Sequence, residues 1–86
     1  MRIRLVEHAK ERANERGASA DEISMVLLKG HEIEVKKGRR GKELIFDYNR
    51  EWLGKHYSQK KVKVVYVEES DEMVVITVKV YYGIWR

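Results

Sequence analysis

The sequence predicts an α+β fold in which two N-terminal helices pack on one face of a four-stranded, mainly antiparallel sheet. Over the first 29 residues, apolar side chains recur at the spacing of an amphipathic helix. From residue 31 onward they alternate with polar side chains, as in a half-buried strand. The chain has 86 residues and no proline, and we expect it to form one domain, residues 1–86.

Glycines and a capping motif delimit the two helices. The first is expected from about Val6 to Arg16, because Gly17 suits the left-handed position that follows a helix. Ser19 and Glu22 have the spacing of a capping box, which opens a second helix through about Lys29. We expect its buried side to consist of three residues, Ile23, Val26 and Leu27.

The remaining chain is expected to form two hairpins. Residues 31–37 and 42–48 alternate in polarity on either side of a turn at 38–41. Residues 61–68 and 73–82 are rich in β-branched side chains and are joined by the polar tip 69–72. The segment between these hairpins, residues 49–60, is expected to form either a loop anchored by Trp52 and Tyr57 or a short helix.

Alternation sorts the side chains of the last two strands onto two faces. The apolar face, expected to lie under the helices, holds Val62, Val64, Tyr66, Val74, Ile76, Val78 and Val80. The other face holds Lys61, Lys63, Val65, Val67, Val75, Thr77, Lys79 and Tyr81. A face that mixes lysine, hydroxyl and aromatic groups suits a nucleic-acid backbone and a stacked base. An ordinary solvated sheet face has a similar composition.

Positive charge is concentrated in the middle of the chain. The whole chain has a net charge of +4, whereas residues 29–63 carry eleven basic and five acidic side chains. Such a cluster suits RNA, a ribosome or an acidic protein partner, although lysines also protect an exposed hairpin from aggregation. The candidate nucleic-acid-binding residues are Lys36, Lys37, Arg39, Arg40, Lys42, Lys63 and Lys79.

Several classes of protein are disfavoured by composition. Cysteine is absent, so no disulfide framework or thiolate metal site is expected. No apolar run approaches the ~20 residues of a membrane span, and we expect a cytoplasmic protein with no membrane partner. The histidines lack the spacing of metal ligands, and no glycine-rich phosphate loop is present, so neither a metal nor another cofactor is predicted. The high share of charged residues, 37%, is typical of proteins from heat-loving organisms.

The first helix contains a motif that resembles a known family. "HAKERANERG" followed by "SADEISMVLLKG" is similar to the H-A-x-x-R-x-x-x-R-G signature of a small domain-of-unknown-function family, which is grouped with RelE-like and BrnT-like toxins. Residues 76–78, "ITV", resemble the family's closing strand. The resemblance implies a RelE/barnase-like toxin architecture, an acidic antitoxin as partner, and metal-independent cleavage of RNA.

That resemblance implies roles for five residues. In-line attack by a ribose 2′-hydroxyl needs a proton acceptor, a proton donor and cations around the phosphate. His8 suits either proton role, while Arg12 and Arg16 suit the phosphate. Thr77 and Tyr81 are further candidates for hydrogen bonds to the substrate. Alternatively, each arginine lays its methylenes over the sheet and donates to backbone carbonyls or nearby glutamates, which serves only the fold.

The sequence thus predicts an RNA-directed protein that resembles the toxin of a toxin–antitoxin pair and is a candidate metal-independent endoribonuclease. The competing prediction is a protein-interaction module without enzymatic activity. Met25 and Leu28 fall outside the buried side of the second helix, and together with the aromatic tail "YYGIWR" (81–86) they would form a homodimer contact.

Overall fold

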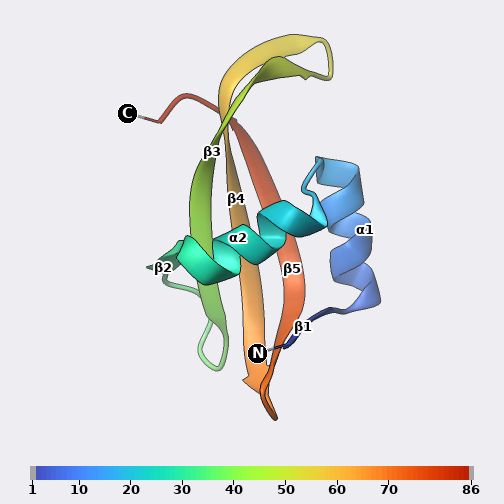
Figure 1. Ribbon diagram of the computed structural model, residues 1–86, viewed down its shortest axis with the longest axis vertical. Coiled ribbons are helices and arrows are strands. Elements are labelled where there is room, and N and C mark those ends of the chain that lie inside the picture. The colour runs from blue at the N-terminus through green and yellow to red at the C-terminus, as the bar shows by residue number, and fades with distance from the viewer. Residues whose placement is uncertain (1, 86) are drawn as a thin grey trace.

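The computed structural model describes residues 2–85 and contains two helices and one five-stranded sheet (Figure 1). The elements are β1 (Arg2–Leu5), α1 (Glu7–Arg16), α2 (Ala20–Lys29), β2 (His31–Ile33), β3 (Arg40–Trp52), β4 (Lys55–Glu69) and β5 (Glu72–Gly83). The strand order is β1-β5-β4-β3-β2. All pairings are antiparallel except that of β1 with β5, which is parallel. The α+β class is confirmed.

The expected number of strands is wrong, because the N-terminal segment forms a fifth strand. In β1, Ile3 lies opposite Met73 and Leu5 lies opposite Val75, and both β1 residues pack against the core. A four-residue strand with arginines at alternate positions has too short a pattern to be distinguished from the start of the following helix. Its parallel pairing with β5, beside three antiparallel pairings, makes the sheet mixed.

The two helices end and begin where the sequence indicates. Gly17 follows α1 with a φ of 84°, in the left-handed region, and its N–H donates to the oxygen of Ala13. Both hydrogen bonds of the capping box between Ser19 and Glu22 are present at the start of α2. The three residues expected to be buried on α2 are buried, with exposed fractions of 2% or less.

The first hairpin is confirmed, but its connection is longer than predicted. β2 and β3 pair antiparallel, and residues 34–39 form the loop between them, so the turn expected at 38–41 is wrong. Gly41 lies within β3, where a Cβ atom would be only 2.7 Å from Cγ1 of Val35. The missing side chain therefore allows the loop to fold closely over the strand.

Residues 49–60 form neither a loop nor a helix, because β3 and β4 continue through them as a hairpin. Leu53 and Gly54 at its tip have φ values of 51° and 84°, which suits a tight turn between twisted strands. Trp52 stacks on Tyr82 with ring centroids 4.9 Å apart, and Tyr57 lies 5.6 Å from the same ring. Both aromatic side chains thus anchor the segment as expected.

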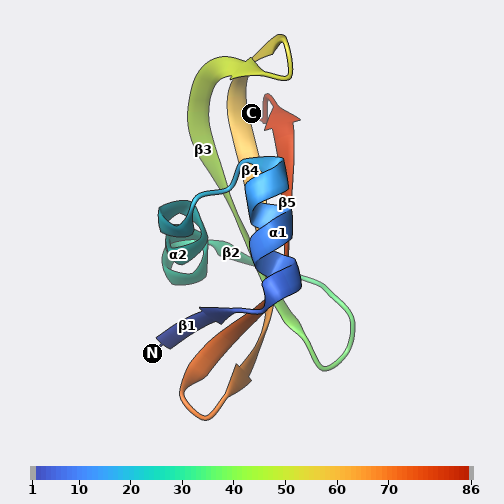
Figure 2. The same ribbon diagram turned by 90° about the vertical axis from the view of Figure 1, so that its right-hand side faces the viewer.

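The core lies between the two helices and one face of the sheet. Ala9 and Ala13 of α1 pack with Val26 and Leu27 of α2 in a single cluster that includes apolar side chains of β4 and β5. Figure 2 shows α2 on one side of the sheet, while the loop between β2 and β3 lies on the other. That second face has no helix over it.

A bulge in β5 makes the predicted assignment of side chains to the two faces of the sheet wrong at two positions, Val74 and Val75. Val65 lies opposite Thr77, but Tyr66 lies opposite Val75, so Ile76 is an extra residue in the strand. Val75 is fully buried in the core under the helices, whereas Val74 is buried outside that cluster. The alternation assumed in the sequence placed these two residues on the wrong faces. Beyond the bulge, Thr77 and Lys79 keep their expected face.

Candidate nucleic-acid interface

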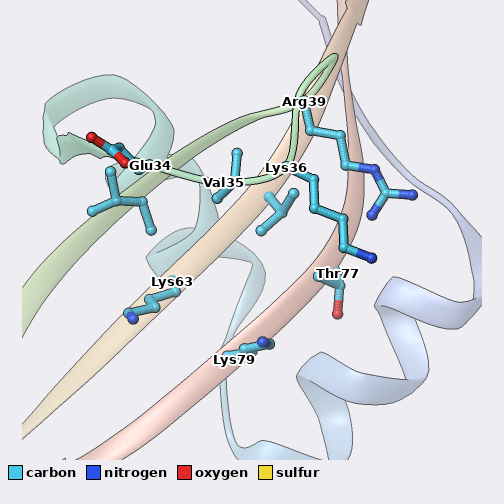
Figure 3. A pocket seen from close by; sticks show the side chains of 9 residues that line it. Glu34, Val35, Lys36, Arg39, Lys63, Thr77 and Lys79 are labelled. Carbon is cyan, nitrogen blue, oxygen red and sulfur yellow. The ribbon is translucent and has the colours of Figure 1, made fainter.

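The helix-free face of the sheet contains a pocket of about 400 Å³, here called the basic pocket. Its walls come from the loop between β2 and β3, from β4 and from β5. Figure 3 shows Lys36 and Arg39 extending from the loop toward β5, above Lys63 and Lys79 on the strands. The nine lining residues are Ile33, Glu34, Val35, Lys36, Arg39, Lys63, Val65, Thr77 and Lys79.

Four cationic side chains from three separate segments therefore line one hollow, with Glu34 as the one acidic lining residue. Lys63 and Lys79 lie directly opposite each other in the β4–β5 register. Like charges in this position repel and destabilise a sheet. Lys63 forms a long ion pair with Glu43, with Nζ 3.9 Å from the carboxylate oxygen, which offsets part of this repulsion. The pocket is thus an electropositive hollow with room for an anion.

A second hollow of about 310 Å³ adjoins the basic pocket at the edge of β5. Arg16, Lys79, Val80 and Tyr81 line it, and Lys79 lines both hollows. Tyr81 is 43% exposed, and the Nζ atom of Lys63 lies 5.2 Å from the centre of its ring. An accessible aromatic ring is therefore placed beside the cations of the basic pocket.

The charged residues of α1 are only partly brought to this region. Nη1 of Arg16 donates to the main-chain oxygen of Val78 at 2.7 Å, so this arginine joins α1 to β5. Arg12 forms a surface ion pair with Glu15 at 3.3 Å. His8 is exposed in the first turn of α1. Neither His8 nor Arg12 lines the two hollows, whereas Arg16, Thr77 and Tyr81 do.

Three other candidate binding residues lie apart from the basic pocket. Arg40 is paired with Glu32 and Glu68, whose hydrogen bonds raise the pKa of the guanidinium above its usual value. Nζ of Lys42 donates to the main-chain oxygen of Leu27 at 2.9 Å, at the C-terminal end of α2. Lys37 is exposed on the loop. The excess charge of the sequence cluster is therefore divided between the two faces of the sheet.

Sequence reasoning missed a buried lysine, Lys60. It is 4% exposed, and its Nζ atom donates to the oxygen of Gly17 at 2.7 Å and lies 2.8 Å from a carboxylate oxygen of Glu22. Its position opposite Phe46 in the register places it on the helix-covered face. The alternation that places Lys60 on this face could have identified it, but residues 49–60 were not predicted to be strands.

An aromatic side chain holds the end of α1 near this lysine. The hydroxyl of Tyr82 donates to the main-chain oxygen of Arg16 at 2.7 Å. Burial, with smaller contributions from Tyr48 and Glu22, raises the pKa of Tyr82 to about 12. These contacts fix the turn between the helices against the sheet, and thereby the position from which Arg16 reaches Val78.

Residues 2–85, the described part of the chain, contain no group of three histidine, cysteine or acidic side chains that could hold a metal ion. They also contain no helix that is both long and apolar enough to cross a membrane.

Comparison with known proteins places these features in a family. The model of the family described as "Domain of unknown function (DUF4258)" matches residues 5–80. No curated protein and no solved structure shows a significant match to the chain. The matched region includes α1, α2 and every strand residue that lines the basic pocket. The chain therefore belongs to the DUF4258 family, a domain of unknown function.

Proposed function

We propose that the protein is an RNA-directed protein of the toxin type, which binds RNA through the basic pocket and the adjoining face of the sheet. The observation that carries this proposal is that Lys36, Arg39, Lys63 and Lys79 line the same hollow. Phosphates are the anions that such a set of cations attracts irrespective of sequence. The toxin class rests on the resemblance of the first helix to the toxin-related signature.

The surroundings of the pocket support a nucleic acid more than a small inorganic ion. Tyr81 offers an exposed ring next to Lys79, and Nζ of Lys61 lies 4.8 Å from the centre of the Trp85 ring on the same face. Basic grooves interleaved with aromatic rings bind single strands by phosphate attraction and base stacking. Arg86, the last residue of the aromatic tail, lies outside the described residues.

The binding function is tested by the salt dependence of affinity for a single-stranded RNA, measured by fluorescence anisotropy. Each phosphate neutralised contributes about −0.7 to the slope of log affinity against log salt. The double variant Lys63→Gln/Lys79→Gln should make this slope less negative by about 1.4 and weaken binding at low salt. Circular dichroism checks that the variant is folded.

The matched control is Lys10→Gln/Lys29→Gln, which removes the same charge from exposed positions on the helices. It should keep a slope closer to that of the original protein. An equal change in both double variants would mean that only net charge matters, and it would contradict a binding site at the basic pocket.

Cleavage of RNA is a second candidate function, favoured by the hollow that brings Arg16, Lys79 and Tyr81 together. In this proposal the cations stabilise the charge that develops on the phosphate, and a proton is transferred by the exposed His8 or by the Tyr81 hydroxyl. Binding is the better supported of the two functions, because His8 lines neither hollow.

Cleavage is tested with free RNA and with programmed ribosomes in the presence of EDTA. Loss of cutting in His8→Ala or Tyr81→Phe, with Arg12→Ala as a comparator from the same helix, would assign the proton transfer. Cutting that persists in both variants would remove these residues from the mechanism. An absence of cutting by the original protein would leave binding as the function.

An acidic antitoxin-like protein is the partner that we propose for the same face. Its carboxylates would pair with the cations of the basic pocket and exclude RNA by occupying their positions. The test is competition between RNA and a small acidic protein that is encoded beside this one and co-expressed with it. Simultaneous binding of both would contradict a shared surface.

A further inference from the structure

We propose that the basic pocket binds the phosphate monoester at one end of a single-stranded RNA, with the terminal base stacked on Tyr81. This inference rests on the proposed RNA binding and assigns the part of the RNA that is recognised. It is carried by the size of the pocket, by the excess of cations over acids among its lining residues and by the ring beside it.

The dimensions of the pocket suit one nucleotide. Its volume of about 400 Å³ lies in the range of sites that enclose a small molecule, about 300–1,000 Å³. The loop between β2 and β3 forms one wall, held close to the sheet because Gly41 lacks a side chain beneath Val35.

The charge of the pocket suits a dianion better than a phosphodiester. Glu34 is the one acid among the lining residues, against four cations. A phosphate monoester carries about −1.5 to −2 charges at neutral pH, whereas an internal phosphodiester carries a single negative charge. Arg40 and Lys42, by contrast, already have partners on the other side of the strand.

The geometry of the cations also suits a group with three free oxygens. Lys36 and Arg39 approach from the loop, whereas Lys63 and Lys79 project from the sheet (Figure 3). Thr77 adds a hydroxyl at the strand between them. Donors on opposite walls can contact different oxygens of a terminal phosphate, while an internal phosphate has two of its four oxygens in ester bonds.

The ring of Tyr81 lies where the attached nucleoside would emerge. Tyr81 follows Lys79 by two residues on the same face, a separation of about 7 Å along a strand. It lines the adjoining hollow with Lys79 and is 43% exposed. Stacking of a base on such a ring is tolerant of sequence, so the inferred recognition is of a strand end rather than of a base sequence.

The test compares one short RNA in three forms: with a 5′-phosphate, with a 3′-phosphate and with hydroxyls at both ends. Fluorescence anisotropy measures affinity at a fixed salt concentration, with a label inside the strand. One phosphorylated form should bind about tenfold more tightly than the hydroxyl form, as expected for one or two additional charge-assisted hydrogen bonds. The form that gains affinity identifies the end that is bound.

Matched variants of the loop locate the effect. Lys36→Gln/Arg39→Gln should abolish the advantage of the phosphorylated RNA. Lys37→Gln should retain it, because Lys37 belongs to the same loop but lines neither hollow. Tyr81→Leu should weaken binding of all three RNAs without changing competition by inorganic phosphate. Loss of the advantage in Lys37→Gln alone would overturn the assignment to this pocket.

The outcomes separate this inference from the proposed function. Equal affinity for the three forms would overturn the terminal-phosphate site and leave RNA binding in place. Binding of none of them would overturn both. Inorganic phosphate that competes as strongly as a phosphorylated mononucleotide would assign the pocket to free phosphate and contradict recognition of a strand end.

Discussion

Arg16 of α1 is hydrogen-bonded to the main-chain oxygen of Val78 in β5, with Nη1 2.7 Å from that oxygen. β1 pairs with β5 only as far as Val75, so the arginine supplies a donor where the neighbouring strand has ended. Its surroundings on a stripe of alanines are explained by this contact, since Ala9 and Ala13 allow α1 to approach the sheet. Arg16 therefore serves the fold while it also borders the second hollow.

Replacement of Arg16 is expected to lower stability more than replacement of Arg12. Arg16→Met leaves the Val78 oxygen without its donor, which should cost about 1–3 kcal/mol in the free energy of unfolding. Arg12→Met removes an exposed ion pair and should cost about 1 kcal/mol at most. Urea denaturation measures both values. Equal costs would mean that the Arg16 contact contributes no more than a surface pair.

Removal of the partner of Lys60 is expected to be more harmful than removal of Lys60 itself. Glu22→Gln leaves a buried ammonium without a countercharge, and a loss of about 3 kcal/mol in the free energy of unfolding is expected. Lys60→Met removes the charge together with its desolvation cost and should destabilise less. Urea denaturation tests this, because Glu22→Gln should unfold at a lower urea concentration than Lys60→Met. The reverse order would contradict a buried ion pair.

A methyl group at position 41 is expected to displace the loop over the basic pocket. In Gly41→Ala the new Cβ would approach Val35 Cγ1 to 2.7 Å, and overpacking of this kind costs about 1–3 kcal/mol. RNA affinity should fall together with stability, because Lys36 and Arg39 move with the loop. Gly38→Asn is the control, since its side chain meets open space and asparagine tolerates a positive φ. Unchanged RNA affinity in Gly41→Ala would contradict the role of the loop.

Stability is expected to fall in alkaline solution partly because of Tyr82. Its pKa is raised to about 12 in the folded protein, from an ordinary value of about 10 in an unfolded chain. The unfolded chain therefore loses this proton first, and the free energy of unfolding should decrease as the pH rises from about 10 to about 12. Tyr82→Phe should make the decline shallower in urea denaturation over that range. If the free energy of unfolding of Tyr82→Phe declined with pH as steeply as that of the original protein, the raised pKa of Tyr82 would be contradicted.

The same substitution has a separate effect at neutral pH. Tyr82→Phe removes the hydrogen bond from the hydroxyl to the Arg16 oxygen, and a cost of about 1 kcal/mol is expected. The stacking with Trp52 is retained by phenylalanine, so the variant should remain folded.

The helices could be predicted from sequence because their ends depend on local chemistry. Gly17 and the Ser19–Glu22 pair act within a few residues of themselves, so their signals are complete in a short window. β1 could not be predicted in this way, because the strand with which it pairs, β5, lies about 70 residues later. The hairpin at residues 49–60 was missed because a bulge between Asp47 and Arg50 and a buried lysine, Lys60, interrupt its alternation.

The part of the candidate site that depends on short sequence patterns could also be predicted. Lys63, Thr77 and Lys79 follow from alternation within strands, and all three line the basic pocket. Lys36 and Arg39 were identified by charge, but which side of the sheet the loop covers depends on its packing over Gly41. Charge alone did not distinguish them from Arg40 and Lys42, whose partners are fixed by tertiary contacts.

The parallel pairing of β1 with β5 also constrains how the protein is made. β1 is synthesised about 70 residues before Glu72 to Val75, with which it pairs. β1 therefore lacks its strand partner while the intervening residues are synthesised, and closure of a loop this long slows folding. A nascent chain stalled before Glu72 would lack β5, so β1 and one edge of β4 would stay unpaired and open to chaperones.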